Sequence, residues 1–197
     1  MTRAPSRRDL TDVRVLAALA HPVRVQLLGY LLELGPHTAT QCSVAVDASP
    51  SACSYHLRHL ERFGLVERAD DQSDPAPDGR ERLWQASATG FSFGGPPSAA
   101  TPALSAAQHA LSLAAIDENA RLAKSYVGVA DTLPAEWQDA AAFATYGIAV
   151  TPGELTTLVA AVDALLRPYI AATRNDPPAT AERVHVTLQA FPRTEPR

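Results

Sequence analysis

Residues 49–64 have the sequence SPSACSYHLRHLERFG, and both ends of a helix can be recognised in it. Ser49 is a favourable N-cap, and Pro50 suits the first helical position. Gly64 lies just past the last residue that fits the helical pattern, where glycine commonly ends a helix. The stretch therefore predicts a helix over residues 50–63.

This predicted helix has two chemically different faces. One is a narrow apolar stripe at helical spacing, formed by Cys53, Leu57 and Leu60. The other carries hydroxyl, phenol and guanidinium groups at helical spacing, namely Ser51, Tyr55, Arg58 and Arg62. We expect the first face to pack into a core and the second to face a polar or anionic partner.

Helix and strand signals on both sides of this helix give the order of the N-terminal half. Apolar periodicity and Gly/Pro stops predict three earlier helices, at about residues 11–19, 22–34 and 40–46. Two short strand candidates follow, at about residues 65–68 and 80–85, and a turn-rich segment joins them. This order is typical of a winged helix-turn-helix, in which the second helix of the motif lies in the DNA major groove.

Three short motifs in this half resemble those of a known family. They are LAALAHPVRVQLLGYL at residues 16–31, SYHLRHL at residues 54–60 and FGLV at residues 63–66. With these motifs in this order, residues 10–93 resemble ArsR-type transcriptional regulators. The resemblance implies a homodimeric DNA-binding regulator, usually a repressor that an effector releases from DNA.

The resemblance and the cationic helix face together predict the contacts to double-stranded DNA. The candidates are polar side chains of this helix and of the second wing strand, namely Ser51, Ser54, Tyr55, Arg58, Arg62, Arg80 and Arg82. Arg58 can make a bidentate contact to guanine, whereas Arg62 is better placed for the phosphate backbone. The alternative is a solvated helix face on which these arginines pair with Glu61.

Three nearby features bear on the same interface. His56 lies beside the apolar stripe, and we interpret it as a packed, hydrogen-bonded histidine. Arg24 lies near a helix N-terminus, where a phosphate contact and a structural ion pair are both open. Carboxylates crowd the wing tip and repel phosphates, so the tip is expected to stay clear of DNA or to be flexible. They are Asp70, Asp71, Asp74 and Asp78.

A Gly/Pro-rich stretch predicts a boundary between a DNA-binding domain, residues 1–95, and a second region, residues 96–197. The second region begins with a long helix from Thr101 to about Val129. Two faces of this helix are apolar, and one small domain cannot cover both. We therefore predict a homodimer held mainly by this helix, with DNA half-sites about one helical turn, roughly 34 Å, apart.

After the long helix, the pattern predicts a strand, a helix and a second strand. Their ranges are about residues 142–150, 151–174 and 183–191. A helix this long followed by a short loop carries the chain back along a sheet, which favours parallel pairing of the two strands. The fold class predicted for the whole chain is mainly α with small β elements (α+β), with a small sheet in the C-terminal region.

Aromatic side chains collect in the C-terminal half, namely Tyr126, Trp137, Phe143, Tyr146 and Tyr169. Between a sheet and helices such rings can line an apolar pocket for a hydrophobic or aromatic effector. Ordinary core packing of the rings is the alternative. A pocket would make the chain a small-molecule sensor that controls DNA binding.

Composition and motifs argue against other classes of protein. The chain has 197 residues, a net charge of −4 and two cysteines. Cys42 and Cys53 lack metal-ligand spacing, so we predict no metal, no cofactor and inert packing of both thiols. No phosphate-loop, GxSxG or HExxH motif is present, and the lone His185 is interpreted as solvent-facing, so we predict no enzymatic activity. Without a secretory leader or a long apolar run, the predicted location is the cytoplasm, with no membrane partner.

Overall fold

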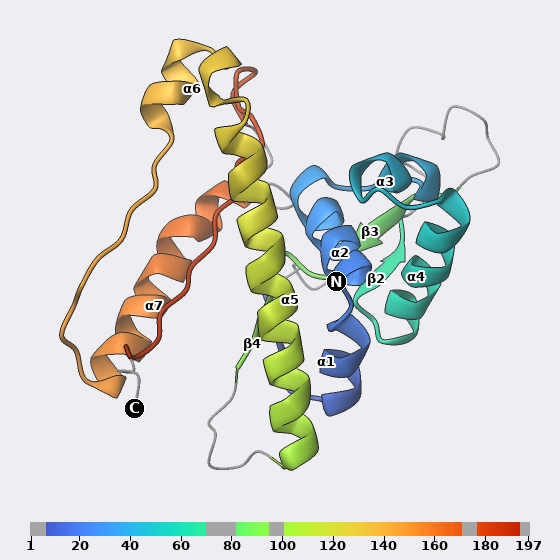
Figure 1. The fold of residues 1–197 in the computed structure, drawn as a ribbon, viewed down its shortest axis with the longest axis horizontal. Coiled ribbons are helices and arrows are strands. Elements are labelled where there is room, and N and C mark those ends of the chain that lie inside the picture. The colour runs from blue at the N-terminus through green and yellow to red at the C-terminus, as the bar shows by residue number, and fades with distance from the viewer. Residues whose placement is uncertain (1–6, 70–81, 95–100, 171–176, 194–197) are drawn as a thin grey trace.

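The computed structural model describes residues 7–69, 82–94, 101–170 and 177–193. Its N-terminal half contains four helices in the predicted order (Figure 1). They are α1 (Val13–Leu19), α2 (Pro22–Leu34), α3 (Ala39–Ala45) and α4 (Pro50–Arg62). The bounds agree with those predicted to within about two residues, which is the ordinary uncertainty of a helix end. The mainly α, partly β fold class is confirmed for the described residues.

Local capping explains where α3 and α4 begin. Thr38 and Gln41 form a capping box at α3, in which each side chain accepts a hydrogen bond from the backbone N–H of the other residue, at 3.2 and 2.8 Å. At α4, the Ser49 hydroxyl accepts the backbone N–H of Ala52 at 3.2 Å. Gly64 follows the helix with φ of +63°, a conformation that glycine adopts without steric cost. Both ends of α4 therefore follow from its sequence.

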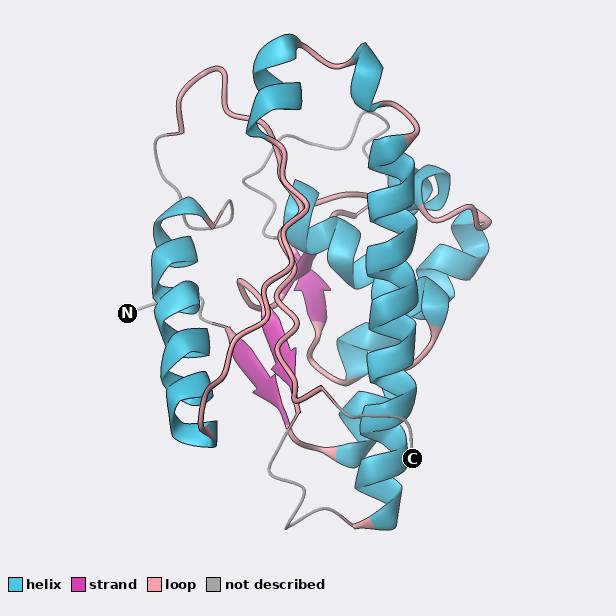
Figure 2. Ribbon diagram, turned by 60° about the vertical axis from the view of Figure 1, so that its left-hand side comes forward, coloured by secondary structure: helices cyan, strands magenta, loops and turns pink. Residues whose placement is uncertain are grey.

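Short strands form two separate pairs in this half (Figure 2). β2 (Val66–Arg68) and β3 (Trp84–Ala86) pair antiparallel and form the base of the predicted wing. β1 (Arg8–Leu10) pairs in parallel with β4 (Phe91–Phe93), a pairing that the sequence analysis did not predict. Both figures show this second pair between the long helix α5 and helix α7.

One apolar cluster contains buried side chains from the five helices α1, α2, α3, α4 and α5 and from the strands β1, β2 and β3. Its most deeply buried side chains are Leu16, Leu27, Leu31, Cys42, Cys53, Leu57, Leu60, Leu65, Trp84 and Leu111. The predicted stripe of α4 is confirmed, because Cys53, Leu57 and Leu60 are each 0% exposed. The core therefore holds α4 by one face and leaves the other to solvent.

Helix α5 (Pro102–Val127) is the longest element, with 26 residues spanning about 39 Å. It packs against α1 and α2, and it contributes Ala107 and Leu111 to the core. Farther along the helix, Leu113 and Ile116 remain 51% and 47% exposed. One face of α5 is thus covered within the chain, whereas Leu113 and Ile116 on a second apolar face are not.

Beyond α5 the described chain consists of helices and coil. The helical pieces are η2 (Ala130–Thr132), α6 (Ala135–Ala140), α7 (Pro152–Leu166) and η3 (Arg167–Tyr169). The predicted capping box opens α7, where Thr151 and Glu154 exchange side-chain to backbone hydrogen bonds. Helix α6 was not predicted. The α-helix expected to reach Arg174 ends at Leu166, and residues 171–176 lie outside the described residues.

The two strands predicted for the C-terminal region are wrong, and so are their parallel pairing and the small sheet there. Residues 142–150 and 183–191 are coil. In Figure 1 the first segment runs along the outer side of α7, and the second passes between α7 and α5. Val184, Val186 and Leu188, whose alternation suggested a covered sheet face, are exposed. Alternation supplies the period of a strand, but a strand also needs a neighbouring backbone as its hydrogen-bond partner.

Candidate nucleic-acid interface

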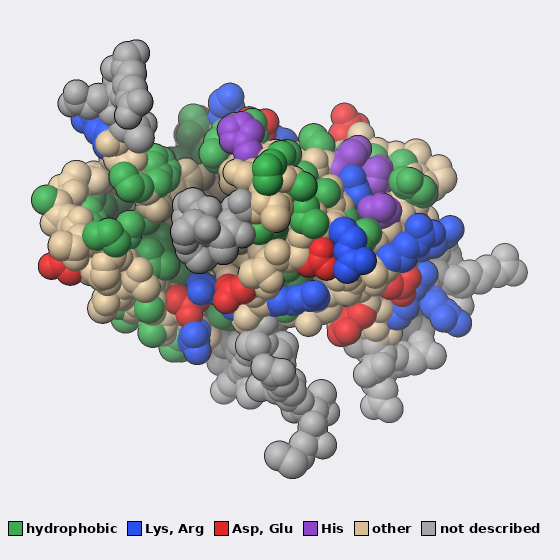
Figure 3. All heavy atoms as spheres, turned by 90° about the horizontal axis from the view of Figure 1, so that it is seen from below, with side chains coloured by type: hydrophobic (Ala, Val, Ile, Leu, Met, Phe, Trp, Pro, Cys, Tyr) green, Lys and Arg blue, Asp and Glu red, His purple; other side chains and the backbone are tan. Residues whose placement is uncertain are grey.

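Helix α4 presents to solvent the polar face that the sequence predicts. Ser51, Tyr55, Arg58 and Arg62 are all exposed, and Ser54 is half-buried at the edge of the face. Figure 3 shows the molecule from below, with arginine and histidine side chains gathered at the end that carries α4 in Figure 1. Hydroxyl, phenol and guanidinium donors are the groups that proteins use to contact phosphates and base edges.

The turn before α4 fixes how that helix is presented. Helix α3 packs against α4, and the two are joined by a short turn in which Asp47 has φ of +48°. Aspartate is one of the few residues with a side chain that accept this left-handed conformation. The Ala48 N–H donates to the Ser43 carbonyl at 3.2 Å and closes the turn. Helix, tight turn and exposed second helix together have the geometry of a helix-turn-helix.

Arg58 and Arg62 of α4 are exposed and form no ion pair with any described carboxylate. Glu61 lies between Arg58 and Arg62 in the sequence, but its carboxylate pairs with Arg68 of β2 at 3.9 Å. Within the described ranges, no carboxylate forms an ion pair with Arg58 or Arg62. The alternative in which Glu61 neutralises these two arginines is therefore not found.

Arg68 connects α4 with the wing and was not singled out by the sequence analysis. Its guanidinium lies 3.4 Å above the ring of the buried Trp84. Burial lowers the pKa of Arg68, Glu61 opposes that effect, and the positive charges of Arg82 and Arg58 lower it further. Arg58 of α4 and the exposed Arg82 of the wing are thus close enough to Arg68 for their fields to act on it.

Part of the predicted wing interface falls on residues that the structure does not describe. Arg80 and the acidic tip, residues 70–78, lie outside the described ranges. The expected contacts of Arg80 and the expected avoidance of DNA by the tip stay predictions.

His56 and Arg24 are found together behind the exposed face of α4. His56 packs against His21 with ring centroids 4.7 Å apart, which confirms its packed position. The expected hydrogen bond of His56 is not present at its buried Nδ1, and the buried Nε of Arg24 also has no partner. In the part of the chain that the structure describes, Arg24 forms no ion pair, so the structural alternative for this residue is not found.

The aromatic residues of the predicted effector pocket are not all brought together in the protomer. The rings of Tyr126 and Phe143 lie 5.9 Å apart. Tyr146 is 82% exposed, Tyr169 is also exposed, and Trp137 is half-buried on α6. An effector pocket formed by this set stays a prediction.

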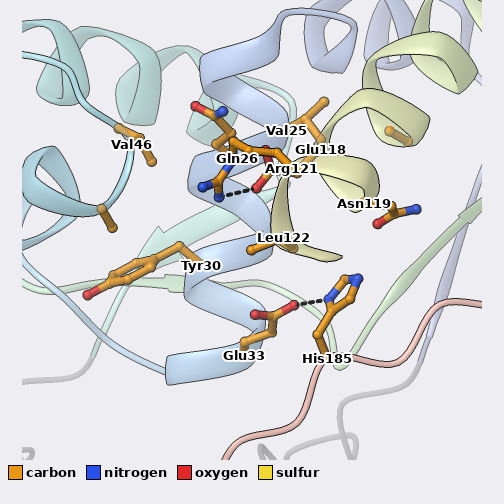
Figure 4. Close-up of a pocket in the computed structure, with 13 residues that line it drawn as sticks. Val25, Gln26, Tyr30, Glu33, Val46, Glu118, Asn119, Arg121, Leu122 and His185 are labelled. Atoms are coloured by element: carbon orange, nitrogen blue, oxygen red, sulfur yellow. Dashed lines mark hydrogen bonds and ion pairs between the residues drawn. The ribbon is translucent and has the colours of Figure 1, made fainter. Parts of the chain in front are cut away.

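A cavity of about 130 Å³ lies elsewhere, between α2, α5 and the C-terminal coil (Figure 4). In it, the Nδ1 of His185 and the Oε1 of Glu33 are 2.6 Å apart. The hydrogen bond with Glu33 raises the pKa of His185, and burial opposes that effect. Glu33 could not be predicted as the partner of His185 from sequence spacing, because the two residues are 152 positions apart.

Both thiols are buried in the core and unpaired. Burial raises the pKa of Cys42 to about 12, with a contribution from the nearby Cys53. Burial also raises the pKa of Cys53. A thiol that stays protonated is a poor nucleophile and a poor metal ligand. No group of three or more His, Cys, Asp or Glu side chains able to hold a metal ion occurs among the described residues.

No single helix in the described ranges is long and apolar enough to cross a bilayer. Only the helices Val13–Leu19 and Pro22–Leu34, which are bent by 91° relative to each other, reach that length and apolar content when they are taken together.

Comparison with known proteins places a family match on the same elements. The sequence profile of the family described as "Bacterial regulatory protein, arsR family" matches residues 21–68, which contain α2, α3, α4 and β2. None of the curated proteins matches the chain.

Solved structures with similar chains include a "possible transcriptional regulator for arsenical resistance", with 29% identity over 56% of this chain and 94% of that chain and a TM-score of 0.31. A point variant of ZitR from Lactococcus lactis has 14% identity over 75% of this chain and 73% of that chain, with a TM-score of 0.28. RV1404 from Mycobacterium tuberculosis has 15% identity over 79% of this chain and 83% of that chain, with a TM-score of 0.29.

Proposed function

We propose that this chain is a homodimeric transcriptional repressor that binds double-stranded DNA with α4 in the major groove, a proposal supported by the match of residues 21–68 to the arsR-family profile. The observation that carries the proposal is the division of α4 into two faces. Cys53, Leu57 and Leu60 are fully buried, whereas the arginines on the opposite face have no carboxylate partner among the described residues. A helix held rigidly by one face can present the other to base edges without an ordering cost.

Each group on the exposed face has a role that fits its chemistry. Arg58, near the middle of α4, makes the bidentate contact to guanine O6 and N7. Arg62 and the wing residue Arg82 lie toward the flanks and contact phosphates, which position the protein without reading sequence. Ser51 and Ser54, near the N-terminus of α4, donate to phosphates, and the positive end of the helix dipole favours an anion there.

Dimerisation through α5 completes the proposal. Leu113, Ile116 and Val127 leave an apolar strip on α5 exposed in the protomer, and a second copy of the same helix covers such a strip symmetrically. Two α4 helices related by that symmetry fit a palindromic site with half-sites about one helical turn, roughly 34 Å, apart.

Control by an effector is the last part of the proposal. The exposed aromatic residues Phe143, Tyr146 and Tyr169 need a further surface to enclose them, so the pocket for a hydrophobic effector forms only in the dimer. Catalysis has no role in this function, and a regulator of this kind acts in the cytoplasm.

Selection of bound duplexes from a random-sequence library tests the central claim. The purified protein should enrich a palindromic site, and Arg58→Ala should weaken binding to that site by about 1–3 kcal/mol and relax the base preference at one position of each half-site. Arg183→Ala removes the same charge from the exposed C-terminal coil, away from α4, and should bind as the wild type does. Failure to enrich any site at moderate salt would contradict the proposed function.

A further inference from the structure

Four basic side chains lie directly behind the DNA-contacting face of α4. His21 and Arg24 come from the start of α2, and His56 and His59 come from α4. The imidazole rings of His21 and His56 are 4.7 Å apart, and the Tyr55 ring lies 5.2 Å from that of His56 and 6.5 Å from that of His59. Since Tyr55 is itself exposed on α4, this basic cluster is continuous with the proposed interface.

Among the described residues, no carboxylate pairs with the basic cluster. The carboxylates of the surrounding elements are engaged elsewhere: Asp12 before α1 with Arg14, Glu33 of α2 with His185, Glu61 of α4 with Arg68, and Glu118 of α5 with Arg121. None of the ion pairs found among the described residues involves a member of the cluster. The charged groups that lower the pKa values of its histidines are other members of the cluster and Arg62.

Three nitrogen atoms of the basic cluster are also left without a hydrogen-bond partner. They are Nδ1 of His21, Nε of Arg24 and Nδ1 of His56, all buried. Buried polar atoms are nearly always satisfied in folded proteins, so several orphans in one place call for an explanation. The residues themselves are only half-buried, which leaves their outer nitrogens within reach of an external group.

We propose that His21, Arg24, His56 and His59 form a subsite for a backbone phosphate of duplex DNA beside the groove that α4 enters, and that DNA binding there is coupled to proton uptake by the histidines. The inference rests on the proposed function. A phosphate supplies a negative charge beside the cluster and accepts hydrogen bonds from its outer nitrogens. Continuity with Tyr55 and Arg62 favours a phosphate of the bound duplex over a free anion.

The coupling to protons follows from the state of the histidines in the free protein. Burial lowers the pKa of His21, His56 and His59, and the positive charge of Arg24 lowers each of them further, together with neighbouring imidazoles for His56 and with Arg62 for His59. A bound phosphate acts in the opposite direction and favours the imidazolium form. The duplex therefore binds more tightly as pH falls, by up to about tenfold for each histidine whose pKa rises by one unit on binding.

Fluorescence anisotropy with a mixed-sequence duplex of about 25 base pairs tests this subsite at low salt, where phosphate contacts dominate affinity. The dissociation constant of the full-length wild type should rise several-fold between about pH 6 and about pH 8. His59→Gln and His56→Gln should each reduce that rise. Arg24→Gln should lower affinity at every pH and reduce the salt slope of log Kd by about 1. His109→Gln on α5, an exposed histidine away from α4, should follow the wild-type profile.

The outcomes separate this inference from the function on which it rests. If the wild type binds no duplex at either pH, both are overturned. If the wild type binds and Arg58→Ala weakens binding, while Arg24→Gln and His59→Gln keep the wild-type pH profile and salt slope, only the phosphate subsite is overturned. Circular dichroism of each variant distinguishes a lost contact from a lost fold. His59→Gln tests the subsite even if Arg24→Gln does not fold.

A titration with inorganic phosphate distinguishes the duplex from a free anion. Histidine signals followed by NMR should move on addition of duplex. If they move to saturation with inorganic phosphate alone and the cluster variants bind duplex as the wild type does, the cluster is a free-anion site, and the proposal of a DNA subsite is wrong.

Discussion

Trp84 and Arg68 show how a single contact connects the core with the proposed DNA interface. Trp84 is 2% exposed, and its backbone pairs with that of His37 at 2.8 and 3.0 Å. The Arg68 guanidinium lies over its ring, where a cation–π contact is worth about 0.5–2 kcal/mol. A residue in the centre of the core thus orients an arginine between α4 and the wing.

The histidines of the basic cluster also make folding stability depend on pH. The pKa values of His21, His56 and His59 in the folded protein lie below their ordinary value of 6.5, mainly through burial. The unfolded chain therefore binds more protons below that value, so the free energy of unfolding should fall as pH drops through the range just below 6.5.

Urea unfolding at a series of pH values measures this dependence. The midpoint for the wild type should decrease as pH falls below about 6.5, and His56→Gln should flatten the curve. The double variant His56→Gln/His59→Gln should flatten it further. Because His185 acts in the opposite direction, the decisive comparison is between variants: if His56→Gln and the double variant follow the wild-type curve at a constant offset, these histidines do not titrate at lower pH in the folded state.

At the scale of elements, α4 is the part of the fold that sequence specifies most completely. Its N-cap, its first-turn proline, its apolar stripe and its terminal glycine all indicate the same helix, and its exposed face supplies the candidate site. The pairing of β1 with β4 could not be predicted in the same way. Each strand has three residues, too few to show a period, and their register pairs positions 83 apart, such as Asp9 with Ser92.

The basic cluster was missed for a related reason. His21 and Arg24 lie on α2 and His56 on α4, so their proximity depends on how the two helices pack, which sequence spacing does not reveal. The prediction of strands at residues 142–150 and 183–191 was wrong. Alternation of apolar and polar residues is a property of one segment, whereas a strand also needs a second segment as its hydrogen-bond partner. Local signals were sufficient wherever a feature is completed within one helix.

Helix α5 carries the prediction on assembly. Ile116→Asp places a charge in the middle of the exposed apolar strip, and burying that charge in a dimer costs several kcal/mol. Sedimentation velocity should show the wild type as a dimer at micromolar concentration and the variant as a monomer. Val44→Asp introduces the same charge at an apolar position of α3 that is 86% exposed, and it should leave the dimer intact. A monomeric wild type would contradict dimerisation.

At the scale of the whole molecule, contacts between distant segments tie the C-terminal region to the helix-turn-helix. The coil of residues 177–193 is held by the pair of His185 with Glu33 on α2 and by the hydrogen bond from Asn119 on α5 to Thr187 at 3.0 Å. Arg7, next to β1, pairs with Asp163 of α7 at 2.8 Å. Helix α2 packs against α4 as well, so the coil contacts an element that supports the DNA-binding helix directly.

The His185 pair makes the attachment of this coil sensitive to pH. The folded-state pKa of His185 is raised above its ordinary value of 6.5 by its hydrogen bond with Glu33. The stabilisation that this pair provides is therefore fully present below pH 6.5 and is lost as pH rises through the folded-state pKa. Nitrogen relaxation NMR should show residues 177–193 becoming more mobile as pH rises. His185→Gln should show that mobility already at about pH 6, whereas His109→Gln should not. Equal rigidity of the wild type and His185→Gln at acidic pH would contradict the role of this pair.

The parallel pairing of β1 with β4 has a consequence for how such a chain can evolve. It brings residues 8 and 91 side by side, so the helix-turn-helix half begins and ends at the same edge, and only the start of α5, as far as Leu111, is needed to complete its core. Changes to the sequence after that point leave this core intact, although they alter contacts with it such as the pair of His185 with Glu33. The same helix-turn-helix core can therefore be combined with C-terminal regions of different length and sequence.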